Sequence, residues 1–151
     1  MMKQSVNHDD RAAKVPGGHV ANILICEDDE LYRQIGEAAF AGSNHLLCFA
    51  KNGDEALARL KTEKIDLVVT DLVMPGKDGL EVIRAVRETH SRMPILAMTA
   101  GLASLKEPLL VAASALGADD VIEKPFRPIA LRQRADALLA KVASRRDESA
   151  A

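Results

Sequence analysis

The stretch IDLVVTDLVMPGKDG, residues Ile65–Gly79, decides the fold of this chain. Its first half is a nearly continuous apolar run of strand length, which ends on the carboxylate of Asp71 and then breaks into a Pro-Gly loop. Strands that are apolar along their whole length, rather than alternating, are typical of parallel sheets that are buried on both faces. The stretch therefore predicts a central, buried strand that carries a negative charge at its carboxyl end.

The same pattern recurs along the chain, because five apolar runs of strand length are each followed by a segment with helical spacing. Alternation of parallel strands with helices indicates right-handed crossover connections. The sequence therefore predicts an α/β fold, a five-stranded parallel sheet flanked by five helices in a three-layer sandwich. The strand-like runs are residues 23–27, 46–50, 66–71, 94–98 and 120–123, and the helical segments are 31–39, 56–60, 80–86, 107–117 and 128–142.

The two ends of the chain differ in composition from this middle part. Residues 1–21 are polar, lack periodicity and include Pro-Gly-Gly, so we expect a flexible N-terminal tail. The polar ending after Val142 predicts a fraying C-terminal tail at residues 144–151. The chain of 151 residues then contains one domain, residues 22–143, which is a usual size for a single hydrophobic core.

Composition limits the expected partners and location. Twenty basic and 22 acidic side chains leave the chain near neutrality and aromatic residues make up 3% of it, so neither nucleic acid nor a membrane is an expected partner. We expect a cytoplasmic location, since no signal peptide or membrane-spanning run is recognisable. Cys26 and Cys48 fall on predicted neighbouring strands, where a bridge is conceivable, but reduced thiols are the preferred interpretation.

Polar side chains gather at the predicted carboxyl ends of the strands. Because the carboxyl ends of parallel strands meet at one edge of a sheet, we expect three acids, one hydroxyl and one ammonium to lie close together there. Taken singly, such residues have plain structural roles, and Asp29 is predicted to cap the helix that follows it. The group at the edge consists of Glu27, Asp28, Asp71, Thr99 and Lys124.

The three acids of this group would crowd into one pocket if the first and third strands are neighbours. Like charges a few Å apart repel by roughly 4 kcal/mol per pair at an effective dielectric constant near 20. A divalent cation would remove this repulsion, and oxygen ligands that leave room for several waters suit Mg²⁺, or Mn²⁺, rather than zinc. The pattern predicts a metal site at Glu27, Asp28 and Asp71.

A metal ion beside a carboxylate favours phosphoryl transfer, because the metal can neutralise charge on the transferred group. Asp71 is then the predicted nucleophile. The ammonium of Lys124 and the hydroxyl of Thr99 would each bind one phosphoryl oxygen. These three residues therefore form the predicted reaction site.

The motifs together resemble the response regulator receiver domain, the CheY-like phosphoacceptor module of two-component signalling. Four separated motifs occur in the right order and at nearly the right spacing, and the resemblance covers about Asn22 to Val142. The stretches that carry it are ILICEDD at 23–29, DLVVTDLVMPGKDG at 66–79, PILAMTA at 94–100 and GADDVIEKPF at 117–126.

The resemblance implies a flavodoxin-like fold with strand order 2-1-3-4-5. It also implies that Asp28 and Asp71 bind Mg²⁺ together with the backbone carbonyl of Val73, and that Glu27 acts mostly through a metal-bound water. The peptide bond between Lys124 and Pro125 would be cis, a form that proline tolerates.

The family also implies a reaction and partners. A histidine kinase or a histidine phosphotransferase would donate the phosphoryl group to Asp71, and the domain would catalyse only its own phosphorylation and dephosphorylation. A downstream protein target would bind the face made by residues 107–117, 120–123 and 128–142.

Two features depart from the family pattern. Val121 stands three residues before Lys124, where the resemblance implies a Tyr or Phe that rotates on activation. Thr99 and Lys124 lie 25 positions apart, a few more than is typical, which predicts a longer loop or a displaced helix between them. Pro108 is predicted to lie in the first turn of that helix, near Glu107.

Three other functions fit parts of the pattern. A receiver-like docking module that works without phosphorylation would be expected to lack Asp71, the acidic pair or Lys124, and all are present. A phosphatase of the haloacid dehalogenase type would need an acid two residues after the nucleophile, where this chain has Val73. A flavin-nucleotide binder would need a phosphate-binding loop after the first strand, where acids would repel phosphate.

Overall fold

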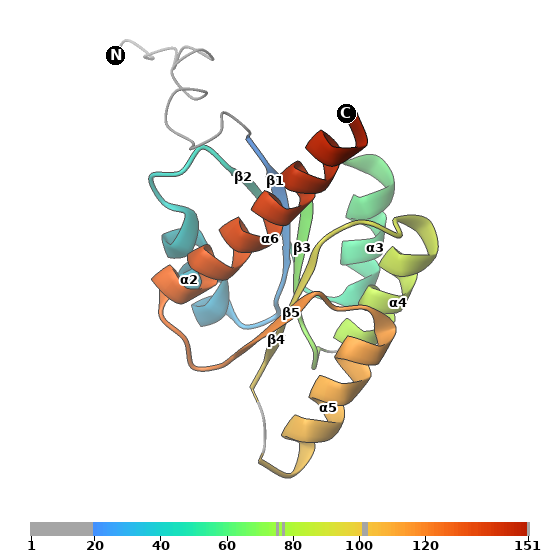
Figure 1. Ribbon diagram of the computed structural model, residues 1–151. Coiled ribbons are helices and arrows are strands. Elements are labelled where there is room, and N and C mark those ends of the chain that lie inside the picture. Colours follow the sequence, from blue (N-terminus) through green and yellow to red (C-terminus); the bar gives the residue numbers. More distant parts are fainter. Residues whose placement is uncertain (1–19, 75, 77, 101–102, 151) are drawn as a thin grey trace, which may run out of the picture.

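The computed structural model describes residues 20–74, 76, 78–100 and 103–150. Its centre is a five-stranded parallel sheet with the order β2-β1-β3-β4-β5, as Figure 1 shows. The predicted fold class and the strand order implied by the resemblance are therefore confirmed. The strands are β1 (Asn22–Cys26), β2 (Leu46–Ala50), β3 (Leu67–Asp71), β4 (Ile95–Thr99) and β5 (Asp120–Glu123).

Five helices in the described residues cover the two faces of the sheet. Helices α2 and α6 pack against each other on one face, and α3, α4 and α5 form a row on the other (Figure 1). The result is a three-layer sandwich in which every connection from one strand to the next runs through a helix. The helices are α2 (Glu30–Phe40), α3 (Gly53–Thr62), α4 (Gly79–Thr89), α5 (Ala103–Leu116) and α6 (Pro128–Ala150).

The apolar strands are buried on both faces, because successive side chains pack into two hydrophobic cores on opposite faces of the sheet. In β3, Val68 packs into the core under α3, α4 and α5, whereas Val69 packs into the core under α2 and α6. All five residues of β3 and of β4 are buried. This explains why the strands read as continuous apolar runs rather than as alternating ones.

Side-chain caps fix where three of the helices begin. The carboxylate of Asp29 accepts a hydrogen bond from the backbone N–H of Leu31 at the start of α2, as predicted. Asn52 caps α3, and Asp78 caps α4 through the N–H of Glu81. These caps satisfy N–H groups that have no partner inside the helix.

The ends of two helices differ from the prediction. Helix α5 begins at Ala103, so Pro108 lies inside the helix and not in its first turn; the preceding residues are good helix formers that extend it upstream. Of the expected longer loop or displaced helix between Thr99 and Lys124, residues 103–106 are helical, and residues 101 and 102 lie outside the described residues. Helix α6 continues through Ala150, so the described part of residues 144–151 is helical, and the fraying of this end stays a prediction. Neither Gly nor Pro interrupts that segment, and a polar composition alone does not end a helix.

The predicted N-terminal tail, residues 1–21, lies mostly outside the described residues. Ala21 belongs to the folded part, because its side chain is buried. Its carbonyl accepts a hydrogen bond from the N–H of Leu46, and its N–H donates one to Nδ1 of His45. Both cysteines are free thiols, as expected. Among the described residues, no helix combines the length and the apolarity that a bilayer span requires.

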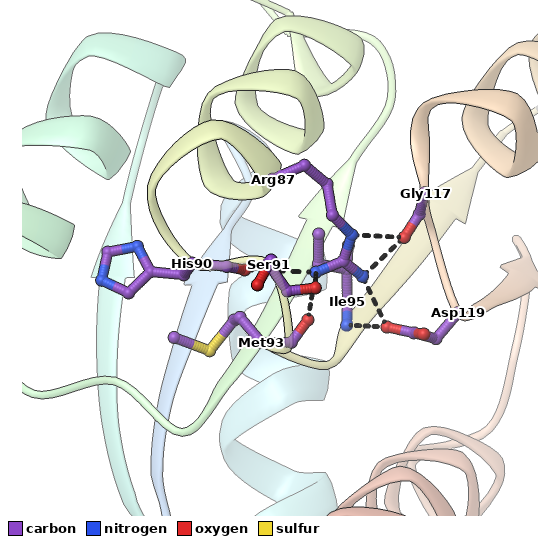
Figure 2. Close-up of polar contacts among 7 residues, drawn as sticks. All are labelled: Arg87, His90, Ser91, Met93, Ile95, Gly117 and Asp119. Carbon is purple, nitrogen blue, oxygen red and sulfur yellow. Dashed lines mark hydrogen bonds and ion pairs between the residues drawn. The ribbon is translucent and has the colours of Figure 1, made fainter.

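Arg87 links four elements at the edge of the sheet opposite to the strand carboxyl ends (Figure 2). Its guanidinium donates hydrogen bonds to the carbonyls of Met93 (2.6 Å) and Gly117 (2.6 and 3.0 Å) and to the carboxylate of Asp119 (2.9 Å). Asp119 in turn accepts a hydrogen bond from the N–H of Ile95. Arg87 therefore ties the end of α4 to the end of α5 and to the starts of β4 and β5.

Gly117 fits this arrangement because it has no side chain. Its backbone has a φ of 112°, which other residues rarely adopt, and an added Cβ would lie 2.7 Å from Nε of Arg87. The end of α5 and the guanidinium can therefore approach closely at this point.

We predict that Arg87→Ala lowers the free energy of unfolding by about 2 to 3 kcal/mol, because it removes the guanidinium donor from the carbonyls of Met93 and Gly117 and one of the two donors of the Asp119 carboxylate. Urea denaturation measures this change. Arg84→Ala is the matched control on the same helix, since the Arg84 side chain is 73% exposed and that of Arg87 is 20% exposed. We expect the control to change stability by less than about 0.5 kcal/mol, and equal losses in the two variants would contradict the role of Arg87.

Candidate functional site

The sheet brings the three predicted acids together. Strands β1 and β3 are direct neighbours, with Cys26 beside Thr70, so the residues that follow β1 lie next to Asp71. One carboxylate oxygen from each of Glu27, Asp28 and Asp71 lies within 4.8 Å of the others. This is a grouping that could hold a metal ion.

Backbone hydrogen bonds extend the sheet into the site and fix its residues. The N–H of Glu27 donates to the carbonyl of Ala50 on β2 (2.9 Å), and the N–H of Lys124 donates to the carbonyl of Thr99 on β4 (2.7 Å). The peptide bond after Lys124 is cis, as the resemblance implied. The site is therefore built on strand ends rather than on long loops.

Lys124 is the charge that holds two of the acids. Its ammonium donates hydrogen bonds to Oε2 of Glu27 (2.5 Å) and to Oδ2 of Asp71 (2.8 Å). All three side chains are buried, that of Glu27 completely. Buried carboxylates need such a partner, because an unpaired buried charge is strongly unfavourable.

Burial and pairing change the acid–base properties of these groups. Burial raises the pKa of Glu27 to about 7, although hydrogen bonds from Lys124 and from the N–H of Asp29 act in the opposite direction. Burial alone would lower the pKa of Lys124, but its hydrogen bonds to Asp71 and Glu27 raise it above its ordinary value. Lys124 therefore stays protonated, as a group that binds anions must.

The hydroxyl of Thr99 lies at the same edge, at the end of β4. The residue is 1% exposed, and its Oγ1 has no hydrogen-bond partner among the residues that the structure describes. A buried hydroxyl without a partner is unfavourable, so its presence needs an explanation. A ligand with an acceptor oxygen at this edge would supply one.

Asp28 and Val73 are more open than the rest of the site. Asp28 is exposed, and the N–H of Val73 donates to Oδ1 of Asp71 (3.2 Å). The three acids fit a hydrated divalent cation, since they offer only a few oxygen ligands and Asp28 is open to solvent. The participation of the Val73 carbonyl stays a prediction.

Sequence reasoning missed one contact of the site. The ring of Tyr32, in the first turn of α2, lies beside Lys124, with the ammonium 4.0 Å from the ring centroid. Phe126 packs against the same ring, at 5.6 Å between centroids. Tyr32 is the single tyrosine of the chain and follows the acids by a few residues, which could have drawn attention to it.

The model of the response regulator receiver domain matches residues 23–136. The chain belongs to this family. The receiver domain is 36% identical over 129 residues to the alkaline phosphatase synthesis transcriptional regulatory protein PhoP of Bacillus subtilis, which covers 85% of this chain and 50% of PhoP. It is 34% identical over 118 residues to the DNA-binding transcriptional regulator NtrC of Salmonella typhimurium, covering 75% of this chain and 24% of NtrC.

Solved structures agree with this assignment. The receiver domain of the Francisella response regulator 1452 superimposes with a TM-score of 0.71 at 26% identity, over 81% of this chain and 98% of that one. The receiver domain described here thus has the fold and the signalling class that the sequence motifs implied.

The relatives bear on the expected partners. The chain spans 50% of PhoP and 24% of NtrC, and the printed names of both describe regulators of transcription. The expectation that nucleic acid plays no part is therefore not supported for a whole protein of this family. The near-neutral charge on which it rested describes the receiver domain alone.

Gly79 allows the chain to pass close to Asp71. A Cβ at residue 79 would lie 1.9 Å from the backbone oxygen of Asp71 and 2.7 Å from Cα of Leu72. Both are backbone atoms, so they could yield only if the end of β3 moved. Gly79 thus sets the path of the chain directly behind the predicted phosphoacceptor.

We predict that Gly79→Ala lowers the free energy of unfolding by about 3 kcal/mol or more, measured by thermal or urea denaturation, because strand and helix must separate. Gly36→Ala is the control within α2. Its Cβ would approach most closely the far end of the Ile25 side chain, at 3.0 Å, and its contact with the Phe49 ring, at 3.8 Å, is an ordinary one; alanine also favours the helix, so we expect a change below about 1 kcal/mol. An unfolding free energy of Gly79→Ala equal to that of the wild type would refute the proposed close approach of residue 79 to the end of β3.

Proposed function

We propose that Asp71 accepts a phosphoryl group from a histidine kinase or a histidine phosphotransferase in a Mg²⁺-dependent reaction, and that this event switches protein–protein contacts in a phosphorelay. The observation that carries the proposal is the convergence of Asp71, a buried ammonium and a partnerless buried hydroxyl at one edge of the sheet. Family membership supports it, since the chain matches the receiver model over residues 23–136.

The chemistry is a phosphoryl transfer to a carboxylate. An oxygen of Asp71 forms a bond to phosphorus while the bond from phosphorus to the donor imidazole nitrogen breaks, and the imidazole keeps the electron pair of that bond and can take up a proton. Hydrolysis later breaks the acyl phosphate, giving inorganic phosphate and the free carboxylate. The domain acts on itself in both steps and is not proposed to turn over a separate substrate.

Two side chains would bind the transferred group. Lys124, which bonds Asp71 in the structure, would donate to one phosphoryl oxygen, and the hydroxyl of Thr99 would donate to another. Ala100, next to Thr99, is small and leaves room beside it. Both donors are held by strand ends, so little reorganisation is needed when charge develops.

The cation would be held by the acids of the site. Asp28 and Asp71 would bind Mg²⁺ directly with the Val73 carbonyl, and Glu27 would bind it mostly through water; Mn²⁺ could replace it. When bound, the metal supplies positive charge that neutralises the phosphoryl oxygens. The three carboxylates fit this role because their charge exceeds that of the one ammonium between them.

The output would use the face of α5, β5 and α6. Val121 on β5 is half-buried and packs against the core under α5, where it cannot rotate as a large aromatic ring could. Phosphoryl transfer itself does not need that rotation, which favours a relay or kinase partner. The cytoplasmic location stays a prediction.

No feature of the described residues favours the alternative, a docking module that needs no phosphorylation. Its expected sign was the loss of a site residue. Asp71, the acidic pair and Lys124 are all present and assembled.

We predict that incubation with acetyl phosphate and Mg²⁺ adds one phosphoryl group to the protein, detected by intact-mass spectrometry. Asp71→Asn should remain unmodified, because an amide is a poor nucleophile. Removal of the cation with EDTA should also abolish the reaction. An unmodified wild-type protein, or equal modification of Asp71→Asn, would refute the proposal and favour the docking module.

We predict opposite effects on stability and function for Thr99→Val. The variant should keep or gain up to about 1 kcal/mol of unfolding free energy, because it removes a buried hydroxyl without a partner, yet it should be phosphorylated more slowly. Thr70→Val is the matched control, since the Thr70 hydroxyl donates to the carbonyl of Asp71 and its loss should destabilise by about 1 kcal/mol. Denaturation and phosphorylation rates are measured on both, and a strongly destabilised Thr99→Val would contradict this account.

A further inference from the structure

Tyr32 contacts the ammonium of Lys124 with the face of its ring. Nζ of Lys124 lies 4.0 Å from the centroid of the ring, which is within the range of a cation–π interaction. The same ammonium bonds Glu27 and Asp71. Lys124 is therefore held by two carboxylates and one aromatic face.

The ring is itself held in place. Tyr32 lies in the first turn of α2, whose start is fixed by the Asp29 cap, and its ring packs against Phe126 at an interplanar angle of 57°. Phe126 follows Lys124 by two residues, so the ring bridges the acidic end of β1 and the chain after β5. Tyr32 is thus a preorganised element of the site rather than a loose side chain.

The carboxylates and the aromatic ring differ in how far they restrict rotation of the Lys124 ammonium. A hydrogen bond to a carboxylate fixes the direction of an N–H, whereas attraction to an aromatic face depends little on rotation of the ammonium. Two of the three N–H groups of Lys124 point at Glu27 and Asp71, so a phosphoryl oxygen binds the third N–H or takes the place of a carboxylate, and the ammonium has to turn in either case. The contact with Tyr32 is compatible with both arrangements.

We propose that Tyr32 is a positioning residue for Lys124, because its ring provides a cation–π contact that keeps the ammonium over the site while the N–H groups turn toward the phosphoryl oxygen. The inference rests on the proposed function of Asp71 and adds a residue to it. The aromatic face carries the effect, and the phenol hydroxyl is not required.

The test compares phosphorylation by acetyl phosphate and Mg²⁺ in wild-type protein, Tyr32→Phe and Tyr32→Leu. Tyr32→Leu should lower the maximal rate at saturating acetyl phosphate by about 5- to 30-fold, with the half-saturating Mg²⁺ concentration changed by less than about twofold. Tyr32→Phe should stay within about twofold of wild type. Leu31→Ala, a truncation of the neighbouring residue whose side chain is exposed, controls for changes in α2 and should leave the rate unchanged.

A fluorination series separates electrostatics from packing. Replacing Tyr32 by phenylalanine with increasing ring fluorination keeps the shape but weakens the negative face, so the logarithm of the maximal rate should fall steadily along the series. This arm stays informative even if Tyr32→Leu does not fold. A rate that is independent of fluorination would overturn the inference.

The failure of this inference can be told apart from failure of the proposed function. Wild-type protein that takes up no phosphoryl group refutes the proposed function and the inference with it. Wild-type protein that is modified, together with a Tyr32→Leu variant of equal rate, refutes the inference alone. A loss in Tyr32→Phe as large as that in Tyr32→Leu would assign the effect to the hydroxyl and would also overturn it.

Discussion

The buried ammonium of Lys124 holds the carboxyl ends of three strands together. Glu27 follows β1, Asp71 ends β3 and Lys124 follows β5, and the two hydrogen bonds of the ammonium join them across the sheet. Each carboxylate would be strongly unfavourable in this place without its cation. Fold and site therefore depend on the same interaction, since the strand ends must stay in register for the charges to meet.

The sheet order explains why this interaction forms at β1 and β3. The chain leaves β1 to build β2 on one side and then returns to build β3, β4 and β5 on the other. The connections after β1 and β3 therefore diverge, and the space between them at the carboxyl edge is left to side chains. The backbone hydrogen bonds from Glu27 to Ala50 and from Lys124 to Thr99 extend the sheet to the border of that space.

Much of this could be predicted from the sequence because it depends on periodicity and on chain direction. Apolar runs that alternate with helical spacing define the parallel sheet, and parallel strands must gather their carboxyl ends at one edge, which places Asp71 near Glu27 and Lys124. The Asp29 cap is a local rule of the same kind. Such features follow from residues close in sequence or from topology alone.

What could not be predicted depends on packing between distant segments. The sequence places Lys124 near the acids, but it does not predict the two hydrogen bonds that join its ammonium to Glu27 and Asp71. The position of Tyr32 shortly after the acids does not by itself predict the contact of its ring with Lys124. The ends of α5 and α6 differ from the prediction for another reason. Pro108 and the polar segment after Val142 look like helix boundaries, yet both lie inside helices that contain no glycine.

The hydrogen bonds of Arg87, at the edge of the sheet opposite to the site, hold the carboxyl end of α5. Its last turn is fastened through Gly117 to Arg87, and through Asp119 to the first residue of β4, whereas its first turn follows the strand that carries Thr99. A displacement that starts at Thr99 would reach this helix at its amino end while the carboxyl end stays anchored. The helix would then swing about a fixed pivot instead of sliding along the sheet, and the largest movement on its surface would occur farthest from Arg87.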